Sequence, residues 1–228
     1  MVDADDACHI HSMHAWAPGV RVDGYRLVDR KGRGGMGEVW LATDLATGAD
    51  RALKLLDTVA DPTMLIRFQR EGEALARLGQ HPNVVRVHAA GVHEGRPWLA
   101  MEWLPGGDLA GRLKHGPLDP AEAARIVRDL ARGLEHAHER GVLHRDLKPQ
   151  NVIFDAEGRP RLGDFGLASL AGASKLTVTG ELLGTPAYMA PEQVTGSKID
   201  ERTDVYALCE VLYCTLFVVS PTDRATVV

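Results

Sequence analysis

The two halves of this 228-residue chain carry different hydrophobic patterns, and that contrast limits the folds open to it. In the first half, short runs rich in β-branched and aromatic residues alternate with glycine and aspartate breaks, which predicts an antiparallel sheet. Beyond Pro105, apolar residues recur at helical spacing. This order predicts an α+β fold of two lobes with a cleft between them. The strands are expected at residues 25–28, 38–43, 51–56, 84–88 and 98–102.

One helix is expected inside the strand-rich half. An Asp-Pro pair at residues 61–62 is typical of a helix start. Gly72 weakens this helix, because glycine has a low helix propensity. Four residues share one face of it: Phe68, Glu71, Leu75 and Leu78.

Two further helices are expected in the second half. Asp119 suits a helix N-cap, Pro120 suits the first helical position, and Gly141 suits the end. The apolar stretch 205–219 contains Glu210 and is shorter than the ~20 residues that span a bilayer. It predicts a buried helix, and no membrane segment is expected in this chain.

The composition of the chain limits the cellular locations and the binding partners that we expect for it. The net charge is −5 and the sequence shows no cluster of lysine and arginine, so nucleic acid is not expected as a partner. The cysteines, Cys8, Cys209 and Cys214, lack any C-x-x-C spacing, which favours a reducing, cytoplasmic location. The first residues are acidic and polar, unlike a signal peptide.

Residues 1–20 show no hydrophobic period. Cys8, His9, His11 and His14 are metal-ligand types, so a metal site is one interpretation. A disordered leader is the favoured interpretation, because chain ends are usually loose and the sequence offers no second cluster of ligands.

A glycine-rich motif, GRGGMGEV, occupies residues 32–39 and matches the pattern G-x-G-x-x-G-x-V. Glycines allow backbone N–H groups to approach phosphate oxygens without an intervening side chain. A dinucleotide-binding turn is the alternative, but a strand is expected after these glycines where that turn requires a helix. The motif therefore predicts a phosphate-binding loop.

A strand lysine follows in the sequence Arg51-Ala52-Leu53-Lys54, which fits the pattern V-A-I-K. A single lysine on a strand is usually only solvated. Glu71, however, lies on the apolar face of the next helix, which is unusual for a surface charge. We expect Glu71 to point into the cleft and to pair with Lys54.

The strongest signal is the run LHRDLKPQN at residues 143–151, followed by Asp-Phe-Gly at residues 164–166. Phosphoryl transfer needs a carboxylate that accepts the hydroxyl proton, oxygen ligands for Mg²⁺, and cations that meet the developing charge. Each fragment alone is also compatible with an ordinary turn. All fragments in this order predict a phosphoryl-transfer site made by Asp146, Lys148, Asn151 and Asp164.

From about residue 25 to 208 the chain resembles the eukaryotic-type serine/threonine protein kinases that are common in bacteria. The motifs GGMGEVW at residues 34–40 and MAPEQ at residues 189–193 are similar to those of these bacterial kinases. The resemblance implies a bilobal protein-kinase fold, with an antiparallel β-rich N-lobe that carries one key helix and a helical C-lobe. The boundaries expected are a leader at 1–20, an N-lobe at 21–102, a partial C-lobe at 103–219 and a tail at 220–228.

The resemblance also implies roles for residues. ATP and Mg²⁺ would be the cofactors, with Asn151 and Asp164 on the metal. The catalytic residues would be Asp146, Lys148, Lys54 and Glu71. The nucleotide would be bound by Gly32, Arg33, Gly34, Gly35, Met36, Gly37, Val39, Ala52, Lys54, Met101, Glu102, Leu104 and Ile153.

Further implied contacts lie around this site. Asp204 would hold the backbone of the catalytic loop, and Thr185 would bond Asp146 and Lys148. A stack of side chains would join the lobes: Leu75, Val87, Phe165 and His144. Lys31 departs from the family pattern, which usually has an apolar residue above the adenine there.

The chain departs from the family after residue 208, and the last helices of the C-lobe are expected to be missing. Glu192 is then expected to lack the arginine that pairs with it in the family. The altered tail from about Cys209 is interpreted as the result of a frameshift or a truncated gene. Three functions stay open: an active kinase with a Ser/Thr protein substrate, an ATP-binding scaffold with little activity, and a remnant that does not fold. Self-association for autophosphorylation is a further possible partnership.

Two threonines between the Asp-Phe-Gly triplet and residue 189 are placed as phosphate acceptors. A phosphate on Thr177 or Thr179 would add about two negative charges, which suit the guanidinium of Arg145. We expect autophosphorylation at one or both. Mass spectrometry of the chain after incubation with Mg-ATP checks this, and an unmodified segment in an active enzyme would contradict it.

Overall fold

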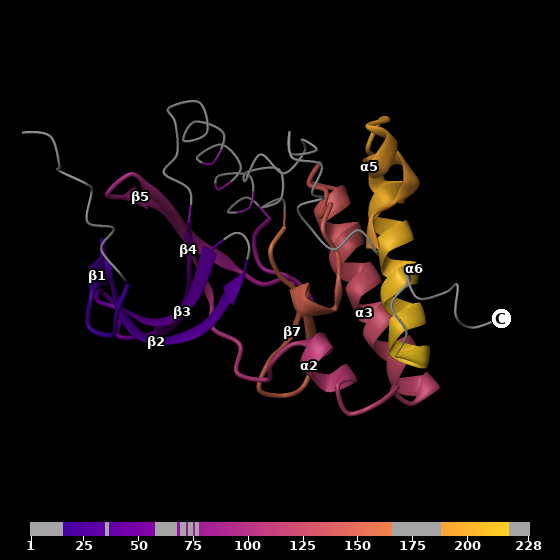
Figure 1. The fold of residues 1–228 in the computed structure, drawn as a ribbon, viewed down its shortest axis with the longest axis horizontal. Coiled ribbons are helices and arrows are strands. Elements are labelled where there is room, and N and C mark those ends of the chain that lie inside the picture. The colour runs from indigo at the N-terminus through magenta and orange to yellow at the C-terminus, as the bar shows by residue number, and fades with distance from the viewer. Residues whose placement is uncertain are drawn as a thin grey trace, which may run out of the picture.

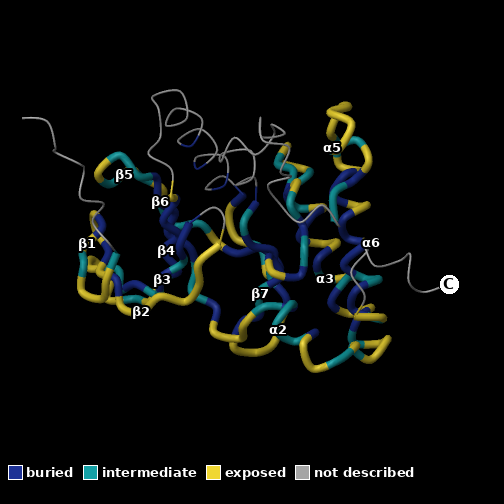
Figure 2. The backbone as a smooth tube through the Cα atoms, viewed as in Figure 1, coloured by how far each residue is buried: buried dark blue, intermediate teal, exposed yellow. Residues whose placement is uncertain are grey.

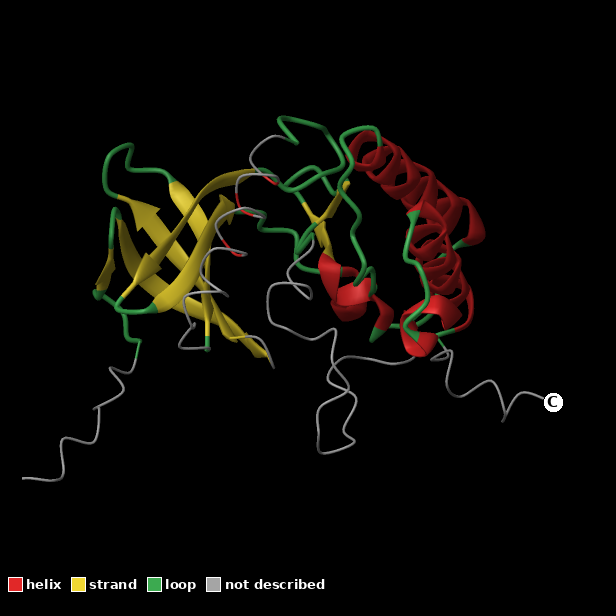
Figure 3. Cartoon of the chain, turned by 90° about the horizontal axis from the view of Figure 1, so that it is seen from above, coloured by secondary structure: helices red, strands yellow, loops and turns green. Residues whose placement is uncertain are grey.

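The computed structural model describes residues 16–34, 37–57, 68, 72, 75, 78–165 and 188–218. A sheet from the first part of the chain lies beside a group of helices from the last part (Figures 1 and 3). This arrangement is the bilobal α+β fold that the sequence predicts. Residues 1–15, with Cys8 and its neighbouring histidines, lie outside the described residues. The expectation of a disordered leader is wrong for residues 16–20: Trp16 and Val20 pack against a core of the N-lobe, and the N–H of Leu27 donates to the carbonyl oxygen of Val20 at 2.9 Å.

The sheet of the N-lobe has six strands in the order β1-β2-β3-β4-β6-β5, and all neighbours are antiparallel. The strand predicted at 84–88 is displaced, because Val84 and Val85 instead pair with Leu162 in the other lobe. The strands are β1 Arg21–Val22, β2 Tyr25–Gly34, β3 Gly37–Asp44, β4 Asp50–Leu56, β5 Val87–His93 and β6 Arg96–Glu102.

The glycine-rich motif forms the end of the β2–β3 hairpin, where Gly34 pairs with Gly37. Gly37 has φ 137°, a conformation that side chains rarely adopt. A Cβ at this position would also collide with the carbonyl oxygen of Leu55 on the neighbouring strand β4. Glycine is therefore required here, as the motif predicts.

The helix predicted in the first half is present at its described positions. Phe68, Gly72 and Leu75 are helical, and Phe68, Leu75 and Leu78 are buried as expected. A Cβ on Gly72 would lie 2.8 Å from the Cβ of Ala90 on β5. Glycine thus lowers the propensity of the helix but allows it to pack closely on the sheet.

The sequence signals the long helix of the C-lobe well, whereas the short helix α2 before it was not predicted. The long helix α3 starts where Asp119 accepts hydrogen bonds from the N–H groups of Ala121 (2.9 Å) and Glu122 (3.2 Å). Gly141, with φ 70°, follows its end as predicted. The elements of this lobe are α2 Leu109–Leu113, α3 Pro120–His138, η1 Pro149–Asn151, β7 Val152–Phe154, β8 Pro160–Leu162, α5 Pro191–Thr195 and α6 Glu201–Phe217.

The prediction of a buried helix at 205–219 is corrected in two ways. Helix α6 runs over Glu201–Phe217, and Val218 ends it in a left-handed conformation with φ 55°. Only one face is buried against α3, since Val205 is 52% exposed whereas Val211 is fully buried. Among the described residues, no helix has the length and apolar character needed to cross a membrane.

The main hydrophobic core continues from one lobe to the other. It contains Leu99 and Met101 from the sheet and Leu130, Leu147 and Leu162 from the C-lobe. A second, smaller core within the N-lobe includes Trp40, Leu53 and Trp98. Figure 2 shows the buried backbone crossing between the lobes. The shared core keeps the residues on both sides of the cleft in fixed proximity.

Gly133 in the interior of α3 allows this helix to pack against the neighbouring segments. A Cβ there would stand 2.8 Å from the carbonyl oxygen of Asn83 and 2.9 Å from Cδ1 of Leu162. We expect Gly133→Ala to lower the free energy of unfolding by about 1–3 kcal/mol, because overpacking outweighs the gain in helix propensity. Urea denaturation measures the change.

Ala131 provides the matched control, since it lies in the same helix and is exposed. Ala131→Gly is expected to destabilise by about 1 kcal/mol through propensity alone. A Gly133→Ala variant more stable than the wild type would contradict the packing argument.

Candidate active site

The loop between α3 and η1 is fixed by a carboxylate from α6. Asp204 accepts hydrogen bonds from the backbone N–H groups of His144 and Arg145, both at 2.8 Å. It also contacts Nε2 of His138 on α3 at 2.7 Å. Asp204 is 1% exposed, so these bonds replace the water that its charge would otherwise bind. The role that the resemblance implies for Asp204 is confirmed.

Three of the predicted residues meet at the end of this loop. Nζ of Lys148 lies 2.7 Å from Oδ2 of Asp146. Nδ2 of Asn151 donates to the carbonyl oxygen of Asp146 at 2.7 Å and to Oδ2 at 3.2 Å. The Asp146 carboxylate keeps about a quarter of its side chain exposed, at 23%. It is therefore held in one orientation and still open to a reactant.

An ion pair joins the two lobes. Nζ of Lys54 on β4 lies 2.6 Å from Oδ2 of Asp164, which follows β8. Lys54 is buried, at 7% exposure, and a buried ammonium needs such a partner. Glu71, the partner expected from the sequence, lies outside the described residues, so that pairing stays a prediction.

His144 is buried behind the catalytic loop and links it to the segment that carries Asp164. Its Nε2 lies 2.9 Å from the carbonyl oxygen of Gly163, and its Nδ1 accepts from the N–H of Asp146 at 3.3 Å. This pair of partners selects the neutral tautomer with the proton on Nε2. Burial lowers the pKa of His144, which also favours the neutral ring.

The predicted stack between the lobes is present. The rings of His144 and Phe165 lie 4.5 Å apart. Leu75 and Val87 line the same small cavity as Phe165. This apolar column joins the helix of the N-lobe, the sheet and the catalytic loop.

The residues predicted for the nucleotide lie in two groups. Gly32, Arg33 and Gly34 are exposed at the end of the β2–β3 hairpin. The apolar residues belong to the shared core or pack against it: Val39, Ala52, Met101, Leu104 and Ile153. Gly35 and Met36 lie outside the described residues, as do Thr177, Thr179 and Thr185.

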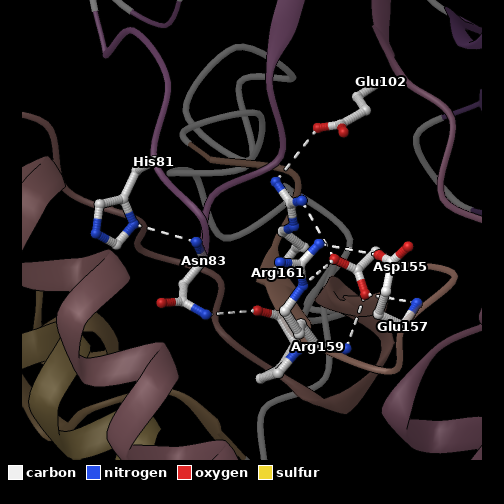
Figure 4. A network of polar contacts seen from close by, with 8 residues as sticks. His81, Asn83, Glu102, Asp155, Glu157, Arg159 and Arg161 are labelled. Carbon is white, nitrogen blue, oxygen red and sulfur yellow. Dashed lines mark hydrogen bonds and ion pairs between the residues drawn. The ribbon is translucent and has the colours of Figure 1, made fainter.

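Arg161 is a residue near the site that sequence reasoning missed. It lies on β8 and pairs with Glu102 at 3.5 Å, where β6 leaves the sheet. It also donates to Oδ2 of Asp155 at 3.2 Å (Figure 4). Its signal in the sequence is weak, a charged residue between the buried Pro160 and Leu162. The connection between the lobes is thus held by an ion pair as well as by the backbone.

Glu38 was also missed, although it lies inside the glycine motif. It is 5% exposed and accepts hydrogen bonds from Arg30 (3.3 Å), Arg33 (3.2 Å) and the indole N–H of Trp40 (2.8 Å). These bonds stabilise the hairpin that ends in the glycine-rich motif. The only sequence feature that could have indicated a buried, paired Glu38 is the presence of Arg33 and Arg30, five and eight residues before it.

The structure shows the surroundings of two residues that depart from the family pattern. Oε1 of Glu192 accepts a hydrogen bond from the hydroxyl of Thr203 at 2.6 Å, so a neutral side chain binds this carboxylate, and the expected loss of its arginine partner stays a prediction. Lys31 pairs with Asp29 at 2.8 Å and stands 5.7 Å from the ring centroid of Trp103. Lys31 therefore makes a cation–π contact with Trp103, which lies in the connection between the lobes.

The comparisons with known proteins agree with this geometry. A model of the protein kinase domain family matches residues 25–227. The chain belongs to the protein kinase family. The match continues past residue 208, where the sequence motifs depart from the family pattern. The curated relatives that it matches include serine/threonine-protein kinases of mycobacteria.

Several mycobacterial kinases are similar to this kinase chain. PknJ of Mycobacterium tuberculosis is 39% identical over 201 residues, which cover 86% of this chain and 34% of PknJ. PknE of the same species is 42% identical over 198 residues, covering 86% of this chain and 35% of PknE. PknB of Mycobacterium leprae is 39% identical over 199 residues, covering 84% and 32%. The chain thus spans about a third of the length of these relatives.

A solved structure supports the kinase fold directly. The crystal structure of a mutant PknI kinase domain from Mycobacterium tuberculosis matches with a TM-score of 0.74 and 35% identity. The match covers 89% of this chain and 77% of the PknI chain.

His144 gives this kinase domain a predictable dependence of stability on pH. The unfolded chain takes up a proton on His144 below about pH 6.5, whereas the folded chain resists protonation because burial lowers the pKa. The contribution of His144 to the free energy of unfolding is therefore fully present above about pH 6.5. It is lost as the pH falls towards the pKa of His144 in the folded chain. We expect His144→Phe to flatten the fall in the free energy of unfolding between about pH 7 and pH 5.

Urea denaturation at several pH values measures this slope. The variant is expected to be less stable at neutral pH, because it loses the hydrogen bonds of the imidazole, so the slope is the informative quantity. Burial also lowers the pKa values of His81 and His88. These two histidines therefore still cause some loss of stability at low pH in both the wild type and the variant. Equal slopes in wild type and variant would contradict the assignment.

Proposed function

We propose that this chain transfers the γ-phosphoryl group of Mg-ATP to serine or threonine hydroxyls of a protein. The observation that carries the proposal is the Asp146 carboxylate, which Lys148 and Asn151 hold in one orientation while 23% of its side chain stays exposed. The Lys54–Asp164 ion pair joins the two lobes beside it in the proposed site. A carboxylate, a cation and two oxygen ligands for a metal are the groups that protein-kinase chemistry requires.

The residues present suit a magnesium ion. The amide nitrogen of Asn151 is the donor to Asp146, so its oxygen is the atom available for a cation. Asp164 supplies a carboxylate with 27% of its side chain exposed. Magnesium binds such oxygens together with phosphate, and when bound it neutralises the charge of the phosphate groups. Asn151 and Asp164 are therefore the proposed metal ligands.

The remaining polar groups have separate tasks in this proposal. Asp146 accepts the proton of the acceptor hydroxyl, and Lys148, 2.7 Å from it, offers positive charge to the transferred group. Lys54 binds phosphate oxygens while Asp164 keeps its ammonium in place, and Glu71 is its second proposed partner. The glycine hairpin at residues 32–37 covers the phosphates with backbone N–H groups.

Adenine is proposed to lie under the sheet. Val39 and Ala52 would cover one face of the purine and Ile153 the other, since all three pack on the shared core. The backbone at residues 102–104 would bind the purine edge, with Met101 beside it. Because the chain spans about a third of its relatives, the protein substrate and self-association stay proposals, as does the cytoplasmic location.

Asp146→Asn separates transfer from binding. The variant keeps the shape of the side chain but loses the base, so the rate of radiolabel transfer to a protein substrate is expected to fall by about 10²–10⁴-fold. The thermal shift produced by Mg-ATP is expected to persist. Asp50→Asn, at an exposed position on β4, is the matched control and should keep full activity.

Transfer that persists in the Asp146→Asn variant would overturn the role of Asp146. A thermal shift without transfer in the wild type would favour the alternative of an ATP-binding scaffold. The absence of cooperative unfolding in the wild type would favour the third alternative, a kinase remnant that does not fold.

A further inference from the structure

The side chain of Gln193 on α5 joins two backbone segments. Its Oε1 accepts a hydrogen bond from the N–H of Ala190 at 3.0 Å, and its Nε2 donates to the carbonyl oxygen of Arg145 at 2.8 Å. A backbone N–H only donates and a carbonyl only accepts, so these partners fix the orientation of the amide. Gln193 thus connects the start of α5 to the residue immediately before Asp146.

Arg145 is a position where such a restraint matters. Its φ of 65° lies in the left-handed region, which is unfavourable for a residue with a side chain. A conformation of this kind persists only when the surroundings hold it. Asp204 holds the N–H of Arg145 at 2.8 Å, and Gln193 holds its carbonyl group. The two side chains therefore restrain the peptide units on both sides of the strained residue.

Helix α5 is itself anchored, so it provides a fixed point. Glu192 accepts a hydrogen bond from Thr203 at 2.6 Å, and Thr203 is 1% exposed on α6. The restraint on Arg145 therefore comes from α6 by two routes. Asp204 reaches the loop directly, whereas Thr203 acts through Glu192 and the neighbouring Gln193.

We propose that Gln193 is a positioning residue for phosphoryl transfer, and this inference rests on the proposed kinase function. Lys148 and Asn151 orient the carboxylate of Asp146. In the peptide that joins Arg145 to Asp146, His144 accepts from the N–H at 3.3 Å, and Gln193 holds the carbonyl oxygen with the shorter bond of 2.8 Å. Loss of that bond lets the strained backbone relax and displaces the base. The groups that bind the nucleotide are untouched, so the effect falls on kcat rather than on KM for ATP.

Two substitutions separate this role from simple helix capping. Gln193→Glu keeps an oxygen for the N–H of Ala190 but loses the donor to Arg145, whereas Gln193→Leu loses both bonds. We expect kcat to fall by about fivefold or more in both variants, the scale of one lost hydrogen bond, with KM for ATP within about twofold. Val194→Ala, at a position 56% exposed, is the control and should match the wild type.

The capping explanation makes a different prediction. If Gln193 only caps α5, Gln193→Glu keeps the kcat of the wild type and only Gln193→Leu loses activity. That pattern would overturn the proposal, because the bond to Arg145 would then have no effect on the reaction.

Amide hydrogen exchange tests the proposal without relying on activity. In both Gln193 variants the peptide covering residues 144–147 is expected to exchange about fivefold faster than in the wild type, and Val194→Ala is expected to leave it unchanged. If the wild-type chain transfers no phosphate, the proposed function fails but this measurement still decides the role of Gln193. Unchanged exchange in Gln193→Glu would overturn it.

Discussion

A buried carboxylate on α6, Asp204, receives hydrogen bonds from α3 and from the loop that carries the proposed base. Removing such an ion from water costs several kcal/mol, so it is tolerated only where enough donors converge on it. His138, His144 and Arg145 supply them at 2.7–2.8 Å. The same bonds that satisfy Asp204 set the path of the catalytic loop. The position of Asp146 therefore depends on how α6 packs against α3.

Backbone strain lies next to both acidic residues of the site. Arg145 precedes Asp146 and has φ 65°, and Asp164 itself has φ 57°. Neither conformation is favourable for residues with side chains, and each is held by contacts distant in sequence. Asp204 and Gln193 restrain the first, and Lys54 binds the carboxylate of the second. Contacts between distant parts of the chain thus hold the strained backbone at the two positions where the proposed site needs fixed geometry.

Local signals in the sequence predicted much of the fold, because their physical cause acts within a few residues. Asp119 caps the nearest N–H groups, and Gly37 is required by its own backbone angle. The motif residues could be assigned together only by resemblance. Contacts such as Arg161–Glu102 lay beyond reach, since residues 59 positions apart in the sequence meet only once the lobes are packed. The bond between Glu192 and Thr203 was missed for the same reason, since the threonine lies on another helix, α6.

The short strand β8 and the residues that follow it connect the lobes at three points. Arg161 pairs with Glu102 at the end of β6, and Leu162 accepts a hydrogen bond from the N–H of Val85 at 2.8 Å. Two residues later, Asp164 pairs with Lys54 on β4. Because so few residues separate these contacts, the packing of the two lobes and the position of the proposed metal ligand Asp164 depend on the same short segment.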